Sequence, residues 1–381
     1  MVKEAAVLIE LIEVTKIYKG QQVPAVDRLS LKIERGETCI FVGPSGCGKS
    51  TTLRMINRMI EPTSGTILID GRDVRQSDPD KLRMGIGYVI QQIGLLPHRT
   101  VAENIAIVPR LYGWPKEKIS RRVDELLALV GLDPETTRHK YPAQLSGGQM
   151  QRVGVARAMA VDPPVMLMDE PFGAVDPVVR NYLQDEFLRL QRELKKTICF
   201  VTHDINEAIK MGDKIAIFNQ GRLVQYGTPY EILTRPANDF VRDFIGYDRA
   251  VKLLSLFPVE KLVQRRVVTV TRPEWARAGE KVAHDRAGGC FLLDEAGQPA
   301  AFVPAGALAG AAAGSAPGDW EQLLRQGREA MVQSTTLLRD ALSLMLELGR
   351  DCLGVLEREQ PVGVITLEEI RQYTCRKEGG Q

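Results

Sequence analysis

Apolar positions in the first 245 residues alternate between short continuous runs and longer helical repeats. A mostly apolar short run is typical of a strand that is buried on both faces of a parallel sheet. Apolar residues at helical spacing instead predict helices, here over 121–130 and 181–194. The predicted strands are residues 37–42, 86–90, 165–168 and 197–201, and the last two fit strands that are buried on both faces. This alternation indicates an α/β domain.

Two early segments have a different, hairpin-like pattern, at residues 8–15 and 67–74. The second contains Asp70-Gly71, a dipeptide that favours a tight turn between two strands. We therefore expect a small antiparallel sheet beside the parallel one.

The pattern changes after residue 245, where two blocks of similar order lie on either side of an Ala-, Gly- and Pro-rich stretch at 301–318. The second block predicts a helix, a strand, a turn at Gln360-Pro361, another strand and a capped helix. The first predicts strands at 289–293 and 300–303 around a turn. We interpret them as two divergent copies of one unit, the first degenerate. The expected bounds are 250–305 for the first unit, 306–328 for a weakly structured linker and 329–377 for the second unit.

Composition narrows the class of protein. The 381 residues include 50 basic and 48 acidic side chains, a net charge of +2 that gives no general attraction to nucleic acid. The apolar runs are far shorter than the roughly 20 residues of a spanning helix, and the N-terminus does not resemble a signal peptide. The six cysteines form no C-x-x-C pair, which favours a reducing compartment. The expected location is the cytoplasm.

The clearest motif is Gly43-Pro44-Ser45-Gly46-Cys47-Gly48-Lys49-Ser50, which fits G-x-x-x-x-G-K-[ST]. It follows a predicted strand and precedes a predicted helix over 51–59, the context of a phosphate-binding loop. Backbone N–H groups of such a loop point at the phosphates. Lys49 would reach the β- and γ-phosphates of a nucleotide, and the Ser50 hydroxyl would bind Mg²⁺.

Two further segments carry related chemistry. Asp169 and Glu170 end an apolar strand, where Asp169 would bind Mg²⁺ directly or through water and Glu170 would polarise an attacking water. Ser146-Gly147-Gly148-Gln149 opens a predicted helix over 150–160 and offers a second site for an anion. A second phosphate-binding helix start in one chain suggests that it completes the site of another subunit.

These motifs identify a family resemblance. Residues 7–245 resemble the ATP-binding cassette (ABC) ATPases, because the phosphate loop, the signature Leu145-Ser146-Gly147-Gly148-Gln149, Asp169-Glu170 and Thr202-His203-Asp204 occur in that family's order. The resemblance implies a P-loop NTPase cassette with a mixed central sheet, a small antiparallel β subdomain and a helical subdomain.

The resemblance also implies roles for single residues. Tyr18 would stack on adenine, and Thr51 would extend the phosphate site. Gln91 would sense the γ-phosphate, approach the Mg²⁺ ion and face a membrane partner, with the adjacent Gln92 leaving an offset of one residue open. His203 would contact the γ-phosphate. Asp176 would lie in a loop that crosses a dimer interface, although Gly173-Ala174-Val175 departs from the usual family pattern.

In this family, two cassettes close head to tail over two ATP molecules. The resemblance thus implies a homodimer in which each site combines the phosphate loop of one chain with Ser146-Gly147-Gly148 of the other. It further implies transmembrane permease subunits, a substrate-binding protein or domain reached through the permease, and a peripheral place on the cytoplasmic face of the plasma membrane.

The branch of the family is indicated by further resemblances. Residues 87–105 resemble importer ATPases, and 55–65 with 105–109 look like those of glycine betaine, carnitine and choline importers. Residues 335–373 resemble a cystathionine-β-synthase (CBS) unit, which implies an α+β tandem CBS module. Such pairs bind a regulatory adenine nucleotide, sense ionic strength or act as structural dimerisation modules, and all three stay open.

Two alternative functions remain. One is import of another small solute, such as an amino acid or a polyamine. The other is a soluble ABC ATPase that is not tied to transport, which the single cassette and the near-zero net charge disfavour.

Overall fold

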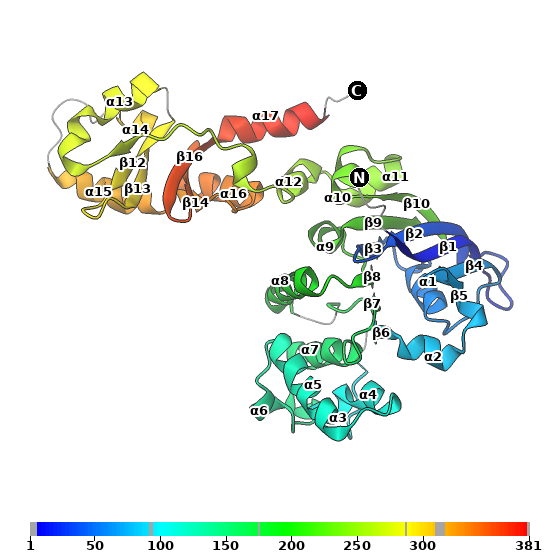
Figure 1. Cartoon of the computed structure of the whole chain (residues 1–381). Coiled ribbons are helices and arrows are strands. Elements are labelled where there is room, and N and C mark those ends of the chain that lie inside the picture. Colours follow the sequence, from blue (N-terminus) through cyan, green and yellow to red (C-terminus); the bar gives the residue numbers. More distant parts are fainter. Residues whose placement is uncertain (1–5, 91–93, 174–175, 286–287, 309–316, 379–381) are drawn as a thin grey trace. The chain divides into compact units, whose positions relative to one another are not determined.

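The computed structural model describes residues 6–90, 94–173, 176–285, 288–308 and 317–378. The chain divides into two compact units, Met1–Ile245 and Gly246–Gln381 (Figure 1). None of the helices in the described ranges is both long and apolar enough to span a bilayer.

The first unit is built on a six-stranded sheet with the order β10-β9-β3-β8-β7-β6. Strands β9, β3, β8, β7 and β6 run parallel, and β10 pairs antiparallel with β9 at one edge. Every residue of β3, β7 and β8 is buried, which confirms the burial predicted for β7 and β8. The bounds are β3 Thr38–Val42, β6 Ile86–Val89, β7 Val165–Asp169, β8 Thr197–Val201, β9 Lys214–Asn219 and β10 Arg222–Gly227.

A four-stranded antiparallel sheet of order β2-β1-β4-β5 packs beside it. Its strands are β1 Val7–Lys16, β2 Val26–Glu34, β4 Ser64–Ile69 and β5 Arg72–Asp73. The hairpin predicted around Asp70-Gly71 is confirmed, with φ of 52° and 74° at the two turn residues. The hairpin predicted over 8–15 is wrong. That segment is one long strand, because it pairs with β2 on one side and with β4 on the other.

Helix α1 (Lys49–Ile56) lies between the two sheets (Figure 1). Its Leu53 shares one hydrophobic core with Phe41 of β3, Phe218 of β9 and Leu11 of β1. The core therefore fixes the helix that follows the phosphate loop against both sheets.

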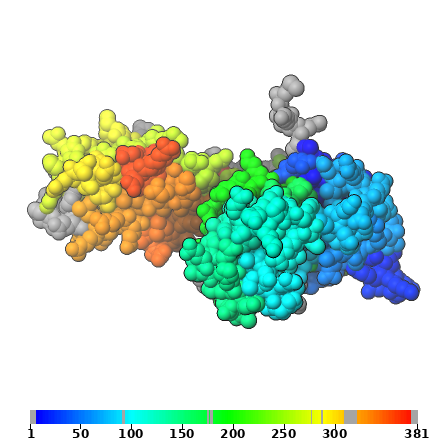
Figure 2. All heavy atoms as spheres, turned by 60° about the horizontal axis from the view of Figure 1, so that its bottom comes forward, coloured from blue at the N-terminus to red at the C-terminus, as the bar shows by residue number. Residues whose placement is uncertain are grey.

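Helices between β6 and β7 form a separate body in this unit. Figure 2 shows it, coloured cyan to green, beside the blue residues of the antiparallel sheet. The helices are α3 Val101–Ile105, α4 Ile107–Leu111, α5 Lys116–Leu129, α6 Pro134–Thr137 and α7 Gly147–Ala158, with the short η2 Pro142–Gln144.

Helices α8 (Pro177–Leu194) and α9 (Ile205–Met211) lie on the same side of the central sheet, opposite α1 (Figure 1). The sequence predicted α8 only from residue 181, and it begins four residues earlier, directly after Asp176. The remaining elements of this unit are η1 Val74–Gln76, α2 Pro79–Met84, α10 Pro229–Thr234 and α11 Asp239–Ile245.

The second unit contains the same sheet twice. In each copy a parallel strand pair is extended by an antiparallel partner, in the orders β11-β12-β13 and β14-β15-β16. In each, a helix connects the first two strands and another follows the third. The bounds are β11 Thr269–Val270, α13 Ala278–Asp285, β12 Gly289–Leu293, β13 Pro299–Pro304, α14 Ala305–Leu308; then β14 Met331–Gln333, α16 Leu338–Leu348, β15 Cys352–Glu357, β16 Gln360–Thr366, α17 Leu367–Glu378.

The structure corrects two predictions in this unit. The linker predicted over 306–328 includes helix α15 (Pro317–Arg328), because Leu323 and Leu324 pack on the core of the first copy. The turn predicted at Gln360-Pro361 lies instead at Arg358 and Glu359, which have φ of 49° and 64° and join β15 to β16. The other elements before β14 are α12 Arg249–Leu254, η3 Val259–Lys261 and η4 Arg272–Arg277.

Candidate nucleotide site

The loop between β3 and α1 requires glycine at two positions. Gly43 has φ of 150°, and a Cβ there would lie 2.2 Å from the carbonyl oxygen of Phe218. Gly48 has φ of 103°, and its Cβ would lie 2.4 Å from the carbonyl oxygen of Ala25. Neither clash can be relieved by a side-chain rotation, because both neighbours are backbone atoms. The glycines of the motif therefore allow the loop to pass close to β9 and to the start of β2.

Lys49 is folded into this loop. Its Nζ donates to the carbonyl oxygens of Gly43 at 2.7 Å and of Pro44 at 2.9 Å, and the residue is only 5% exposed. Pro44, Ser45 and Gly46 form the exposed rim of the loop, and Cys47 is buried beneath it. Burial raises the pKa of the Cys47 thiol, opposed by the charge of Lys49. A lysine held here places positive charge where a phosphate chain would follow the loop.

Ser50 and Asp169 meet at the carboxyl end of β7. The Ser50 hydroxyl donates to Asp169 Oδ1 at 2.8 Å. Burial raises the pKa of Asp169, and the bond from Ser50 acts in the opposite direction. A hydroxyl and a carboxylate are the oxygen ligands that Mg²⁺ accepts. Across the described ranges, no three His, Cys, Asp or Glu side chains gather as a metal cage. The pair thus fits an ion that takes its other ligands from phosphate oxygens and water.

Strand register brings Glu170 and His203 to the same edge. Asp169 of β7 is level with Val201 of β8, which is level with Phe41 of β3. Glu170 follows at once with φ of 46°, and its N–H donates to the carbonyl oxygen of Val201 at 3.0 Å. His203 Nδ1 lies 3.3 Å from Glu170 Oε2, and its side chain is 58% exposed. The Glu170 carboxylate and the His203 imidazole therefore face each other beside Ser50 and Asp169.

Tyr18 and Thr51 close the site on the side of the antiparallel sheet. The Tyr18 hydroxyl lies 3.3 Å from Thr51 Oγ1, in the first turn of α1. The tyrosine is 36% exposed. Its ring is accessible beside the phosphate loop, as a stacking partner for a base must be.

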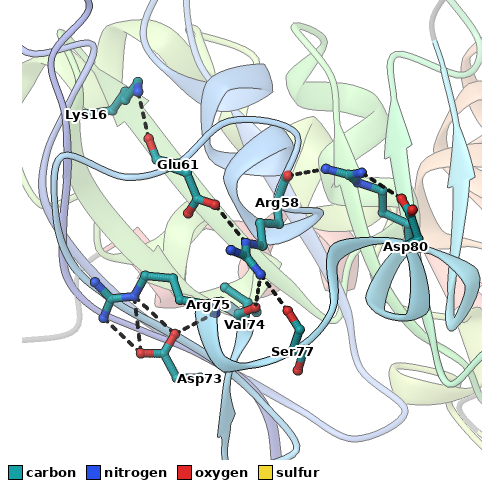
Figure 3. A network of polar contacts seen from close by, with 9 residues as sticks. Lys16, Arg58, Glu61, Asp73, Val74, Arg75, Ser77 and Asp80 are labelled. Atoms are coloured by element: carbon teal, nitrogen blue, oxygen red, sulfur yellow. Dashed lines mark hydrogen bonds and ion pairs between the residues drawn. The ribbon is translucent and has the colours of Figure 1, made fainter.

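The far end of α1 is held by a polar network around Arg58 (Figure 3). Arg58 Nη1 donates to the carbonyl oxygens of Ser77 at 2.6 Å and Val74 at 3.2 Å, and its Nε donates to Glu61 at 2.7 Å. Lys16 of β1 donates to the carbonyl oxygen of Glu61 at 2.6 Å. The helix behind the phosphate loop is thus tied to β1 and to the segment before α2.

The signature segment lies at the start of α7. Ser146 is the N-cap: its hydroxyl accepts from the N–H of Gln149 at 3.3 Å, and Gln149 Oε1 accepts from the N–H of Ser146 at 3.0 Å. Ser146 and Gly147 are exposed, and a Cβ on Gly147 would meet no atom within 4 Å. Asp176 is exposed directly before α8. The predicted Gln91, and Gln92 beside it, lie outside the described residues.

Sequence reasoning missed a buried acid next to His203. Glu207 of α9 is 7% exposed and accepts from Thr202 and from Gln184 of α8. The sequence carries a partial signal, because Glu207 and Met211 are one helical turn apart and the surrounding Ile205, Ala208 and Ile209 predict that this helix is buried.

Comparison with known proteins agrees with this geometry. The family model described as "ABC transporter" matches residues 26–173. The osmoprotectant import ATP-binding protein OsmV of Salmonella typhimurium is 49% identical over 303 residues, 78% of this chain and 79% of that protein. The carnitine transport ATP-binding protein OpuCA of Listeria monocytogenes is 44% identical over 368 residues, 93% of this chain and 88% of that protein.

Two solved structures are similar to the first unit. The dimeric bacterial ABC transporter cassette MJ0796 is 36% identical, with a TM-score of 0.53, over 58% of this chain and 99% of that one. The same cassette in a post-hydrolysis state, bound to ADP and Pi, gives 35% identity, a TM-score of 0.53 and the same coverage.

The fold, the phosphate loop and the match to the family model together define an ATP-hydrolysing cassette of the ABC class, which uses ATP with Mg²⁺. Such cassettes work with transmembrane permease components. Within the class, this chain belongs to the ATP-binding subunits of osmoprotectant importers, because relatives of that group match it along most of their length.

Proposed function

We propose that this chain drives the import of quaternary-amine osmoprotectants, such as glycine betaine, carnitine or choline, across the plasma membrane. One observation carries the choice of solute: the relatives that it matches at 44–54% identity are named for osmoprotectant, carnitine, glycine betaine or choline transport. The chain would lie peripherally on the cytoplasmic face, against permease subunits that receive solute from a binding protein or domain.

The site geometry supports a role for each residue in ATP hydrolysis. Lys49 and the backbone N–H groups of residues 43–51 would bind the phosphates, with Tyr18 stacked on adenine. Ser50 and Asp169 would hold Mg²⁺, which neutralises charge on the phosphates, and Gln91 would approach the same ion. Glu170 would accept the proton of the attacking water, and His203 would donate to the γ-phosphate as negative charge develops on it.

A head-to-tail homodimer would complete two such sites. Ser146, Gly147 and Gly148 are exposed or half-exposed at the positive end of α7, where an anion is stabilised. In the dimer this helix start and Gln149 would face the γ-phosphate of the partner's nucleotide, and Asp176 would lie at the interface. The dimeric state of the similar cassette MJ0796 supports this arrangement.

For the second unit we propose a tandem CBS pair that regulates the cassette. Its support is the repeated sheet topology, with one parallel and one antiparallel pairing in each copy. The proposed bounds are 250–305 and 329–377 for the two CBS units, after a cassette at 7–245, with a regulatory nucleotide as the predicted ligand of the pair.

Uptake in cells tests the proposed solute. Cells that lack other osmoprotectant importers would express this chain with the permease and solute-binding chains encoded beside it. We expect salt-stimulated uptake of radiolabelled glycine betaine that Glu170→Gln abolishes. Two results together would contradict the proposed solute: cells that take up an amino acid or a polyamine but no quaternary amine, and a purified chain that still hydrolyses ATP. The assignment of an ABC ATPase would then stand.

A further inference from the structure

Behind His203, one buried carboxylate connects two elements of the cassette. Glu207 Oε2 accepts from the Thr202 hydroxyl at 2.5 Å, and its Oε1 accepts from Gln184 Nε2 at 2.9 Å. Both partners are buried, with Thr202 2% and Gln184 3% exposed. Thr202 follows the end of β8, whereas Gln184 lies on α8. Each oxygen of Glu207 therefore binds a different element.

Each of the two residues that donate to Glu207 is close in sequence to a loop of the proposed site or lies on the helix that follows it. Thr202 is the residue before His203, and its hydroxyl also accepts from the N–H of Asp204 at 3.1 Å. Gln184 lies two helical turns after Pro177, where α8 begins next to Asp176. The carboxylate thus lies between the loop that would contact the γ-phosphate and the loop that would lie at the dimer interface.

The physical chemistry makes this connection rigid. A buried carboxylate is unfavourable unless it is hydrogen-bonded, and hydrogen bonds to an ionised acceptor are roughly twice as strong as neutral ones. Burial raises the pKa of Glu207, while the bonds from Thr202 and Gln184 and the charge of Arg180 oppose that rise. Removing the carboxylate would leave a buried hydroxyl and a buried amide without this partner.

We propose that Glu207 is a positioning residue that couples the His203 loop to the start of α8. A displacement of α8 when a partner cassette engages Asp176 is then transmitted through Gln184 and Glu207 to Thr202, and so to His203. This inference rests on the proposed roles of His203 and Asp176.

The test measures steady-state ATPase activity and ATP binding of the purified full chain. Glu207→Leu should lower kcat by up to about a hundredfold, the loss that a misplacement of about 1 Å can cause, while the Kd for ATP stays within about twofold. Glu207→Gln should restore kcat, since both hydrogen bonds can form after the Gln184 amide rotates. Lys210→Ala is the matched control. It removes a surface ion pair between α9 and α8, 2.8 Å to Asp185, without touching Thr202, and should leave kcat unchanged.

Two further variants keep the proposal falsifiable if Glu207→Leu does not fold. Gln184→Met breaks only the link to α8 and should lower the Hill coefficient for ATP toward about 1. Adding Gln184→Met to His203→Ala should reduce kcat no further. Full cooperativity in Gln184→Met, or a multiplicative loss of kcat in the double variant with His203→Ala, would overturn the proposal. Wild-type kcat in His203→Ala alone would instead contradict the proposed role of His203.

Discussion

The cassette has two glycine-rich helix starts, and their surroundings are opposite. In the phosphate loop, Gly43 and Gly48 lie against backbone carbonyls, and a Cβ on either would clash. In the signature segment, Gly147 is exposed and has open space around its Cα. The first loop is shaped by contacts within its own chain. The second has its Ser146 cap and open space beside Gly147, as expected of a surface that binds a group belonging to a partner.

The comparison separates two requirements that look alike in sequence. A glycine with φ of 103° and a neighbour at 2.4 Å is required for folding. A glycine such as Gly147, with ordinary dihedrals and no neighbouring atom, is not needed for folding. Its proposed role is to leave room for a group of the partner subunit. Substitutions in the phosphate loop should therefore lower the stability of the chain, whereas substitutions in the signature segment should lower the ATPase activity of the dimer.

The largest effect is expected from Gly43→Ala. The new Cβ would lie 2.2 Å from the carbonyl oxygen of Phe218, so the loop or β9 must shift, at a cost of at least about 3 kcal/mol. At 2–4 °C per kcal/mol, the Tm should fall by roughly 6 °C or more, and ATP binding should be lost. The control is Gly46→Ala in the same loop, where φ is 78° but no atom lies within 4 Å. Equal Tm values for the two variants would break the comparison.

Ser146→Ala should have a smaller effect on stability and a clear effect on turnover. Loss of the N-cap bond to Gln149 removes about 1 kcal/mol. ATP binding to the chain's own phosphate loop should persist, while kcat falls on the order of a hundredfold because the partner's site loses this hydroxyl. Thr228→Ala removes an equivalent cap from α10. A similar loss of kcat in that control would contradict a role for Ser146 at a shared site.

Asp169→Asn should change how the stability of the phosphate-loop region depends on pH. Burial raises the pKa of Asp169 in the folded chain, so ionisation opposes folding and stability falls as pH rises from the unfolded pKa through the raised one. Without nucleotide, the variant should be more stable than wild type at pH 7, by about 1 kcal/mol or less, and this gain should vanish below about pH 4. Thermal unfolding across pH measures it.

The same variant should lose the stabilisation that Mg²⁺ with ATP gives the wild type, whereas Glu170→Gln should retain it. A loss of stability for Asp169→Asn at neutral pH that vanishes at low pH would show instead that the carboxylate is ionised and stabilising in the folded chain.

The smallest effect is expected from Tyr18→Phe. It removes one long hydrogen bond, 3.3 Å to Thr51 at a partly exposed position, so the free energy of unfolding should change by about 0.5 kcal/mol. The ring remains, and ATP affinity should be unchanged. Tyr18→Ala should weaken ATP binding by roughly two- to tenfold, the range of a lost aromatic stack. An equal loss of affinity in both variants, measured by titration calorimetry, would assign the contact to the hydroxyl instead.

Much of this arrangement could be predicted from the sequence because it depends on local patterns. Continuous apolar runs predicted β7 and β8, and the spacing of glycines with Lys49 and Ser50 predicted the loop that meets Asp169. Residues 8–15 were harder, since this one strand pairs on both edges with segments farther along the chain, which a short window does not include.

The pairing of Glu207 with Gln184 could not be predicted. The two residues are 23 positions apart on different helices, and only tertiary packing shows that both face inward. Helix α15 was missed for a related reason. An Ala-, Gly- and Pro-rich stretch precedes it, and its Leu323 and Leu324 are explained only by the core on which they pack.

The strand order has a consequence for how far this site can be adjusted. Phe41, Val201 and Asp169 lie at one level on β3, β8 and β7, and neighbouring strands are about 4.8 Å apart. The distance from the strand of the phosphate loop to the strand of the acidic pair is therefore two strand spacings, roughly 10 Å. It can change only in whole steps, by inserting or removing a strand. Substitutions can change the side chains at this edge, but the sheet keeps the spacing between β3 and β7 constant.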